Sequence, residues 1–469
     1  MSNNSANVEK EVLRIALPSV EIPPPESSSD QADKQTIAGL IFEPVVELRD
    51  CHPVPALAES WTITEDGRRW TMDLAKDRHF HDGGLCTAQD VKAACERLLG
   101  AEGPFEMEGP YVPYLSQLDV QIESAHRISF ESDRPMGYLP EILSGVMVGE
   151  TATGSVANGT GPYRVADYID GQELTLVQTD RTKGRYPRIQ IVAIQAAEER
   201  LRALRSGAVH VASALESLGR SVDPQGISIH ETVNTLSVTG FCNGFHRPFA
   251  DPLARLGINL AVDVNSIIRE IWSGMAIPAT TVVSPNHLGY PAHLTPHPYD
   301  PEAARRLFDK VDMPSVLQIR TPHTVPDRAL EVANMIAQYL SNIGIDANID
   351  DQENRPLYAR EVGAKEIGHL GIFDSSPRST YRVMWEKISS KARGLWWQGV
   401  TDDRADELID DAALAFESRD RDLAYAKALC WLHENPHWLY LYHPIKLWGR
   451  DPSVQGITMD AGGMFRILD

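Results

Sequence analysis

The 469-residue sequence predicts an α/β protein. Between residues 316 and 349, a strand-like run, a run with helical spacing and an alternating run follow one another, as in a βαβ unit. Between residues 61 and 98, two alternating runs flank a turn at Glu65-Asp66-Gly67 and precede a helix. Hydrophobic residues make up 42% of the chain and charged residues 23%, which is typical of a globular protein with a sizeable core.

The βαβ pattern consists of three consecutive segments. Residues Val316 to Arg320 read as a short strand, and residues 332–343 then repeat apolar side chains at helical spacing. Gly344 is a typical helix stop, and the residues from Ile345 to Ile349 alternate as the next strand. We therefore expect two parallel strands joined by a helix in this part of the chain.

The hairpin pattern depends on apolar residues that alternate on either side of its turn. These residues are Trp61, Ile63, Trp70, Met72 and Leu74. Thr87, followed by Asp90, then has the spacing of a helix-capping box. We expect a helix after Thr87 that presents Val91, Ala94 and Leu98 on one face.

The charge and the cysteine content limit the partners and the compartment. The formal net charge of −21 argues against direct binding to nucleic acid or to an anionic membrane surface. The first residues are polar and do not resemble a secretory signal. Five cysteines without regular spacing favour free buried thiols, although one bridge from Cys51 to Cys86 or Cys95 is an open alternative.

The sequence offers no clear catalytic or metal-binding constellation, and we expect neither an enzyme nor a cofactor. His79 and His81 lie on one face of an extended segment, but neighbouring ligands at zinc-like spacing are missing, which favours a structural role. No serine lies in a G-x-S-x-G turn. The paired aspartates are typical of solvated surfaces in an acidic protein.

The stretch from Pro55 to Leu98 resembles a known family signature. It contains, in order, P-A-L-A-E-S-W, a D-G turn, F-H-D-G and T-A-Q-D-V before a helix. G-T-G-P-Y at residues 159–163, and the run from Phe241 to Gly274, continue the match. The chain thereby resembles the family 5 extracellular solute-binding proteins, the peptide, nickel and opine receptors of bacterial ABC importers.

The resemblance implies a periplasmic-binding-protein-like fold of type II, cluster C, with two hinged lobes and a smaller extra subdomain. The first lobe is expected to comprise residues 8–49 and 157–237 and to be completed by residues 441–469. The extra subdomain is expected at residues 50–156 and the second lobe at residues 238–440.

The same resemblance implies function. The protein is expected to capture an oligopeptide or amino-acid conjugate by lobe closure and to deliver it to membrane permease subunits, acting as a monomer. An opine or oligosaccharide receptor of the same fold is one alternative, and an intracellular sensor or enzyme is another. We expect a periplasmic location with a signal peptide removed, and a cytoplasmic location is the alternative.

One acidic residue and one basic residue are the first candidates for the ligand site. The resemblance places Asp374 where peptide receptors of the family bind the free amino group of the ligand. A turn-capping role is an equally good interpretation of Asp374 from the sequence. Arg378 departs from the family pattern and could instead bind an anionic group.

Aromatic and amide residues complete the candidate site. Trp396 and Trp397 could form a ligand wall, and neighbouring side chains of a strand would point to opposite faces, so at most one would face the ligand. Which of the two does so is left open. Phe241 and Asn243, at a predicted strand end, are weaker candidates of the same kind.

Overall fold

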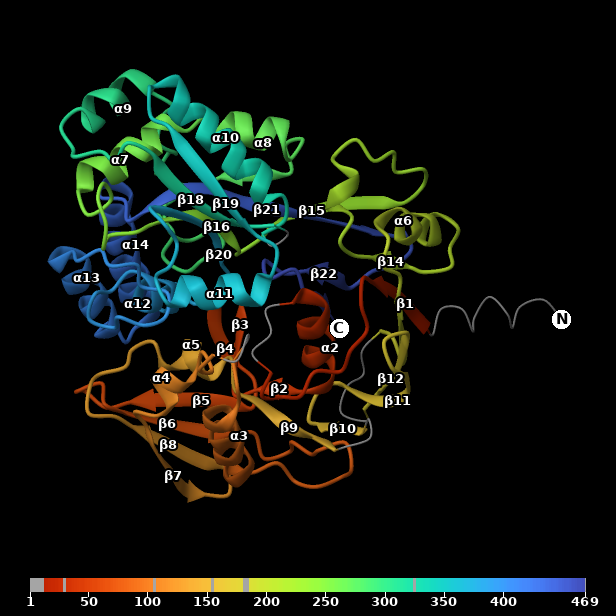
Figure 1. Cartoon of the computed structure of the whole chain (residues 1–469). Helices are drawn as coiled ribbons and strands as arrows, with labels where there is room; N and C mark the ends of the chain where they lie inside the picture. Colours follow the sequence, from red (N-terminus) through yellow and green to blue (C-terminus); the bar gives the residue numbers. More distant parts are fainter. Residues whose placement is uncertain are drawn as a thin grey trace. The chain divides into compact units, whose positions relative to one another are not determined.

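The computed structural model divides into two compact units. It describes residues 12–27, 31–103, 107–152, 156–179, 185–323 and 326–468. Unit 1 comprises residues 1–232 and 446–469, and unit 2 comprises residues 233–445. The chain, drawn from red to blue in Figure 1, therefore leaves unit 1 once and returns to it near its end.

The unit boundaries differ slightly from the predicted lobe boundaries. They lie at 232/233 and 445/446, where the sequence predicts 237/238 and 440/441. The second boundary lies inside one continuous strand, β21 (Trp438–Arg450), so no change of pattern marks it in the sequence. The separate subdomain at residues 50–156 stays a prediction, and residues 8–11 and 153–155 of the predicted segments lie outside the described residues.

Unit 1 contains most of the strands of the first half of the chain. Its helices are α2 (Ala32–Ile41), α3 (Ala88–Gly100), α4 (Val112–Leu115), α5 (Leu139–Leu143), α6 (Ala197–Arg205) and the 3-10 helix η3 (Glu216–Leu218). Its strands are β1 (Val12–Leu17), β2 (Glu43–Pro44), β3 (Val46–Arg49), β4 (His52–Pro55), β5 (Ala58–Ile63), β6 (Arg69–Leu74), β7 (Asp119–Ser124), β8 (Arg127–Glu131), β9 (Met147–Ala152), β10 (Val156–Gly159), β11 (Tyr163–Ile169), β12 (Glu173–Gln178), β13 (Arg188–Ala193), β14 (Val211–Ala212), β15 (Ser228–Val233), β22 (Ile457–Met459) and β23 (Phe465–Ile467).

The predicted hairpin and helix of unit 1 are confirmed. Strands β5 and β6 pair in antiparallel register, with Ile63 opposite Trp70, inside a sheet of order β5-β6-β8-β7. Thr87 and Asp90 form the expected capping box at the start of α3. The main sheet of this unit runs β11-β12-β13-β1-β14 and ends on the last residues of β21.

Unit 2 is a mixed sheet between two groups of helices. Its strands are β16 (Ser237–Cys242), β17 (Ala276–Pro278), β18 (Leu317–Pro322), β19 (Ala347–Gln352), β20 (Leu370–Ser375) and the first part of β21. Its helices are α7 (Pro252–Ala261), α8 (Val264–Glu270), α9 (Pro301–Phe308), α10 (Ala329–Asn342), α11 (Arg355–Gly363), α12 (Thr380–Lys387), α13 (Asp403–Ala413) and α14 (Ser418–Glu434).

The predicted βαβ unit is confirmed as β18-α10-β19. The two strands are parallel, with Ile319 opposite Ile349, and they form one edge of the order β21-β16-β20-β18-β19. Asp300 caps α9 by accepting a hydrogen bond from the Ala303 amide, with Pro301 at the first helical position.

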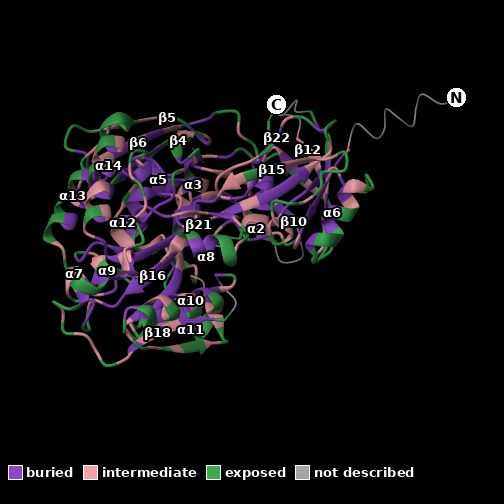
Figure 2. Ribbon diagram, turned by 90° about the horizontal axis from the view of Figure 1, so that it is seen from above, coloured by how far each residue is buried: buried purple, intermediate pink, exposed green. Residues whose placement is uncertain are grey.

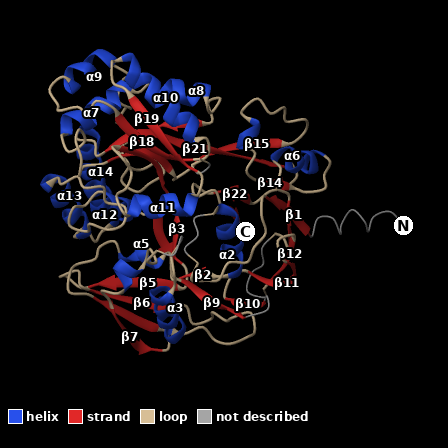
Figure 3. Ribbon diagram, in the orientation of Figure 1, coloured by secondary structure: helices blue, strands red, loops and turns tan. Residues whose placement is uncertain are grey.

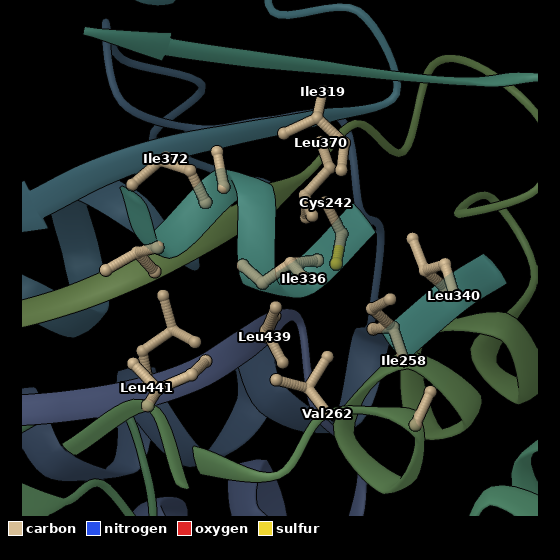
Figure 4. Close-up of a cluster of buried hydrophobic side chains, with 14 of the residues drawn as sticks. Cys242, Ile258, Val262, Ile319, Ile336, Leu340, Leu370, Ile372, Leu439 and Leu441 are labelled. Carbon is tan, nitrogen blue, oxygen red and sulfur yellow. The ribbon is translucent and has the colours of Figure 1, made fainter. Parts of the chain in front are cut away.

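One face of this sheet, the aliphatic face, is packed by α7 to α10. Figure 3 shows these helices gathered beside β18 and β19. The strands contribute Val238, Cys242, Leu317, Ile319, Leu370, Ile372, Leu439 and Leu441. Figure 4 shows several of these side chains meeting Ile258 of α7, Val262 directly after it, and Ile336 and Leu340 of α10. Because these contacts are apolar, this face supplies hydrophobic stabilisation without directional bonds.

The opposite face, the mixed face, carries aromatic, hydroxyl and histidine side chains. Side chains alternate along a strand, which places most of these residues between the aliphatic ones, and His443 joins them beyond a register shift in the pairing of β16 with β21. They are Ser237, Thr239, Phe241, Phe373, Ser375, Trp438, Tyr440 and His443, and all are buried. Figure 2 shows buried residues along β16 and β21. Tyr440 donates a hydrogen bond to the Leu432 carbonyl of α14 at 2.6 Å, so α14 covers this face.

Candidate functional site

Asp374 lies one residue before the end of β20, and its side chain remains partly accessible. The Nη2 atom of Arg355 lies 3.2 Å from Asp374 Oδ1, with both side chains about one-sixth exposed, at 15% and 17%. In this position the carboxylate forms an ion pair, which is a more specific role than the turn cap that the sequence also allowed.

Arg355 is positioned by the start of α11. Asn354 caps this helix by accepting a hydrogen bond from the Leu357 amide at 2.9 Å. The guanidinium of Arg355 also lies over the ring of Phe373, 4.7 Å from its centroid. The neighbouring residues Phe373 and Asp374 of β20 therefore both hold Arg355.

Lys387 and Trp396 complete a compact group. The Lys387 side chain is buried, and its Nζ atom donates to the Asp374 carbonyl at 3.4 Å and lies 5.5 Å from the centre of the Trp396 ring. The Trp396 ring lies 5.0 Å from that of Phe373. We call Arg355, Phe373, Asp374, Lys387 and Trp396 the Asp374 cluster.

The cluster combines two kinds of binding chemistry. A half-buried carboxylate and two cations can form charge-assisted hydrogen bonds with ligand groups of opposite charge. The half-buried ring of Trp396, which lies tilted against the buried ring of Phe373, provides apolar contact for a ligand. Such a combination of aromatic surface with a few placed charges is typical of small-molecule binding sites.

Arg378 lies in the turn that joins β20 to α12, four residues after Asp374. Its side chain is half-buried. The adjacent Pro377 carbonyl accepts a hydrogen bond from His287 Nε2 at 2.8 Å. Arg378 is thus on the same short segment as Asp374.

The two tryptophans lie in a turn between α12 and α13, so their predicted placement in a strand is wrong. Trp396 belongs to the Asp374 cluster. Trp397 is buried elsewhere, where its Nε1 donates to the Val400 carbonyl at 2.9 Å and its ring meets Phe245 edge-on at 5.3 Å. Of the two, Trp396 is therefore the one that contacts Phe373 and Lys387 of the cluster.

Phe241 and Asn243 lie in the interior of unit 2. Phe241 is fully buried between the rings of Phe373 and Trp438. The Asn243 amide donates to the Gly368 carbonyl at 2.8 Å, and its oxygen accepts from the Phe245 amide at 3.2 Å. Phe241 supports the cluster from beneath Phe373, and Asn243 holds the chain at the end of β16.

The other chemical candidates of the sequence have structural roles in unit 1. His81 Nε2 lies 3.1 Å from the Gly161 carbonyl, and its Nδ1 accepts from the Gly159 amide at 3.4 Å. In the described part of the chain no group of three or more histidine, cysteine or acidic residues could hold a metal ion. Burial raises the pKa of Cys86 and Cys95 to about 12, which keeps these thiols protonated.

All five cysteines are free, so the alternative of a bridge from Cys51 is wrong. The sequence could not exclude a disulfide from Cys51 to Cys86 or Cys95, because spacing in the sequence says little about distance in space.

Three members of the cluster were not predicted, namely Arg355, Phe373 and Lys387. Asn354 followed by Pro356 is a helix-start signal that the sequence does contain. It indicates where α11 begins, but the meeting of Arg355 with Asp374, nineteen residues later, depends on how α11 packs on the sheet.

Comparison with known proteins identifies the family. Residues 52–385, more than half of the chain, match the model for bacterial extracellular solute-binding proteins, family 5 Middle. The chain belongs to this family. The function predicted from the sequence, solute capture as the binding component of an ABC importer, is confirmed at the level of this family.

Relatives and solved structures agree with this family 5 assignment. The probable di/tripeptide-binding protein 5 of Pseudomonas aeruginosa (strain UCBPP-PA14) is 26% identical over 87% of this chain and 85% of its own length. The heme-binding protein A of Haemophilus influenzae is 24% identical over 87% and 82%. The Helicobacter pylori periplasmic binding protein DppA, solved with the peptide STSA, superposes with a TM-score of 0.77 at 20% identity, over 99% of this chain and 100% of that one.

These superpositions confirm the predicted type II periplasmic-binding-protein fold. In the described residues, no helix of this family 5 protein is both long enough and apolar enough to cross a membrane.

Proposed function

We propose that this family 5 protein binds a short peptide or amino-acid conjugate in the periplasm and presents it, as a monomer and without altering it chemically, to the permease of an ABC importer. The di/tripeptide-binding relative with 26% identity supports the peptide class. The family description as extracellular supports the location.

The observation that carries the proposal is the Asp374 carboxylate beside an aromatic wall. The described contact of Arg355 is with Oδ1, and a carboxylate has about four acceptor sites, so a ligand ammonium can bind the second oxygen while Arg355 keeps its place. Trp396, supported by the buried ring of Phe373, then contacts the neighbouring apolar part of the ligand.

An opine or another ligand with an additional carboxylate is the second candidate. The observation that favours it is the pair of cations, Arg355 and Lys387, beside Asp374. The planar guanidinium of Arg355 matches a carboxylate in a bidentate manner. An oligosaccharide is supported only by the ring of Trp396, on which a sugar can stack.

A thermal-shift screen with di- and tripeptides, opines and oligosaccharides tests the ligand class. A ligand that binds only the native state raises the melting temperature in a saturable way. We expect saturable hits among peptides. Hits confined to opines or sugars would select the second candidate, and steady consumption of a hit would support an enzyme instead.

Calorimetry on Asp374→Asn tests the anchoring role with the best peptide of that screen. The substitution keeps the shape and removes the charge, so losing the charge-assisted bond is expected to weaken binding by about 2–4 kcal/mol, or roughly 30- to 1000-fold. Asp309→Asn, an exposed position of the same unit, is the matched control and is expected to bind normally. Unchanged affinity in Asp374→Asn would remove this residue from the site.

A further inference from the structure

A buried coil of unit 2 lies against the turn that carries the candidate site residues. We call residues 376–379, between β20 and α12, the site turn. The coil contains polar residues that are all buried, namely Thr280, Thr281, Ser284 and His287. Because buried polar groups need hydrogen-bond partners, the partners of these side chains show what the coil holds in place.

His287 connects the coil to the site turn by one defined tautomer. The Ser284 amide donates to His287 Nδ1 at 3.2 Å, and a backbone amide can only donate, so Nδ1 is the acceptor. The proton must therefore be on Nε2, which lies 2.8 Å from the Pro377 carbonyl and donates to it. Burial lowers the pKa of His287 to about 4, so the ring is neutral near pH 7.

A second bond joins the same two segments. Thr380, the first residue of α12, donates through its hydroxyl to the Leu288 carbonyl at 2.7 Å. Ser379 caps α12 by accepting from the Arg382 amide at 3.2 Å. Pro377 of the site turn and Thr380, which directly follows the turn, are thus bonded to two consecutive residues of the coil, His287 and Leu288.

The geometry places both candidate ligand residues next to this attachment. Asp374 lies three residues before Pro377, and Arg378 directly follows Pro377. His287 itself is only 4% exposed, so a ligand on the surface would not touch it. Its contact with Pro377 nevertheless limits where the backbone between β20 and α12 can lie.

We infer that His287 is a positioning residue of the ligand site, whose Nε2–H bond to the Pro377 carbonyl fixes the site turn and thereby orients Asp374 and Arg378 for binding. This inference rests on the proposed function for the identity of the site. The bond from Ser284 orients the imidazole, whereas the bond to Pro377 transmits its position to the turn.

The matched variants His287→Gln and His287→Asn separate these two bonds. The glutamine amide reaches the position of Nε2 and can keep the bond to Pro377, while the asparagine amide reaches only the position of Nδ1 and can keep the bond from Ser284. Both substitutions are polar and similar in size, so general loss of stability is expected to be similar. His297→Leu, a half-buried histidine beyond the same coil, controls for removal of an imidazole.

Hydrogen exchange in the absence of ligand is the first measurement. In His287→Asn, the amides of Ser376, Arg378 and Ser379 are expected to exchange at least about tenfold faster than in the wild type. His287→Gln and His297→Leu are expected to remain within about threefold. Equal exchange in the asparagine and glutamine variants would overturn the inference, whatever the ligand is.

Binding of trialanine, measured by calorimetry, is the second measurement. The asparagine variant is expected to lose about tenfold or more in affinity, and the glutamine variant to stay within about threefold of the wild type. Equal affinities in the two variants would also overturn the positioning role. If the wild type does not bind trialanine, that result counts against the proposed peptide class, and the exchange measurement still decides on His287.

Discussion

The two faces of the sheet in unit 2 are stabilised by different chemistry. On the aliphatic face, Ile336 and Leu370 belong to a continuous apolar cluster with the helices α7 to α10. On the mixed face, Thr239 donates to the Leu439 carbonyl at 2.8 Å, and Ser237 Oγ lies 3.2 Å from His443 Nδ1. The central strands β16, β20 and β21 therefore contribute non-directional packing to one face of the sheet and directional hydrogen bonds to the other.

This difference indicates where function can be placed. Apolar packing tolerates small shifts of a side chain, whereas a hydrogen bond weakens steeply when its geometry changes. His287 and the site turn are held by directional bonds, and Phe373 of the Asp374 cluster lies on the mixed face. That side is also the one whose stability depends on protonation, because burial lowers the pKa of His287 to about 4 and that of His443 to about 3.

The largest expected effect is loss of packing on the aliphatic face. Ile336 is fully buried, and Ile336→Ala is expected to lower the free energy of unfolding by about 2–5 kcal/mol, because it removes apolar burial and leaves a cavity. Urea denaturation at pH 5 and pH 8 should give the same difference at both values. Gln338→Ala, exposed on the same helix, is the control, and a strong pH dependence of the Ile336→Ala effect would break the comparison.

The mixed face is expected to lose stability in acid. The folded-state pKa values of His287 and His443 lie below the unfolded value of about 6.5, so the unfolded chain binds more protons below that pH. The free energy of unfolding should therefore fall as the pH drops from about 6.5 towards 4, by on the order of 1–2 kcal/mol per histidine at pH 5.

Urea denaturation across this pH range measures the effect. His443→Leu removes one of the titrating groups and should flatten the slope between pH 6.5 and 5, even if the variant is less stable overall. An unchanged slope would show that His443 does not contribute to the acid sensitivity.

Two nearly isosteric substitutions on opposite faces of the same strand, β16, sharpen the comparison further. Thr239→Val removes a donor from the mixed face and is expected to destabilise by about 1 kcal/mol. Cys242→Ser buries a hydroxyl in the aliphatic face and is expected to destabilise by about 1–3 kcal/mol. If either swap stabilised the protein in thermal or urea unfolding, the corresponding face would have been assigned the wrong character.

The smallest expected effect concerns Asp374 in the absence of ligand. The Asp374 carboxylate forms an ion pair with Arg355 even without ligand, so it contributes to the unliganded fold. Asp374→Asn is expected to lower stability by up to about 1 kcal/mol, because both partners are still partly solvated. A double-mutant cycle with Arg355→Gln measures the coupling, and a coupling of zero would contradict the pairing.

Several elements of the fold could be predicted because their signals are local. The Glu65-Asp66-Gly67 turn and the capping box at Thr87 involve residues within a few positions of one another. The strands and helix of β18-α10-β19 follow from the spacing of apolar residues, because this spacing shows which face of each element packs into the core. Asp374 and Trp396 were likewise found from the sequence, through a family motif and a pair of adjacent tryptophans.

The sequence by itself thus determined the fold class, the family and the order of the elements, because these depend on near neighbours and on a long ordered motif. Only the tertiary structure decided that Arg355 pairs with Asp374, that Trp396 and not Trp397 packs on Phe373, and that His287 bonds to the Pro377 carbonyl. These contacts join residues that are 19, 23 and 90 positions apart in the chain. No local pattern records such pairs, because their distances are set by how whole helices and coils pack against the sheet.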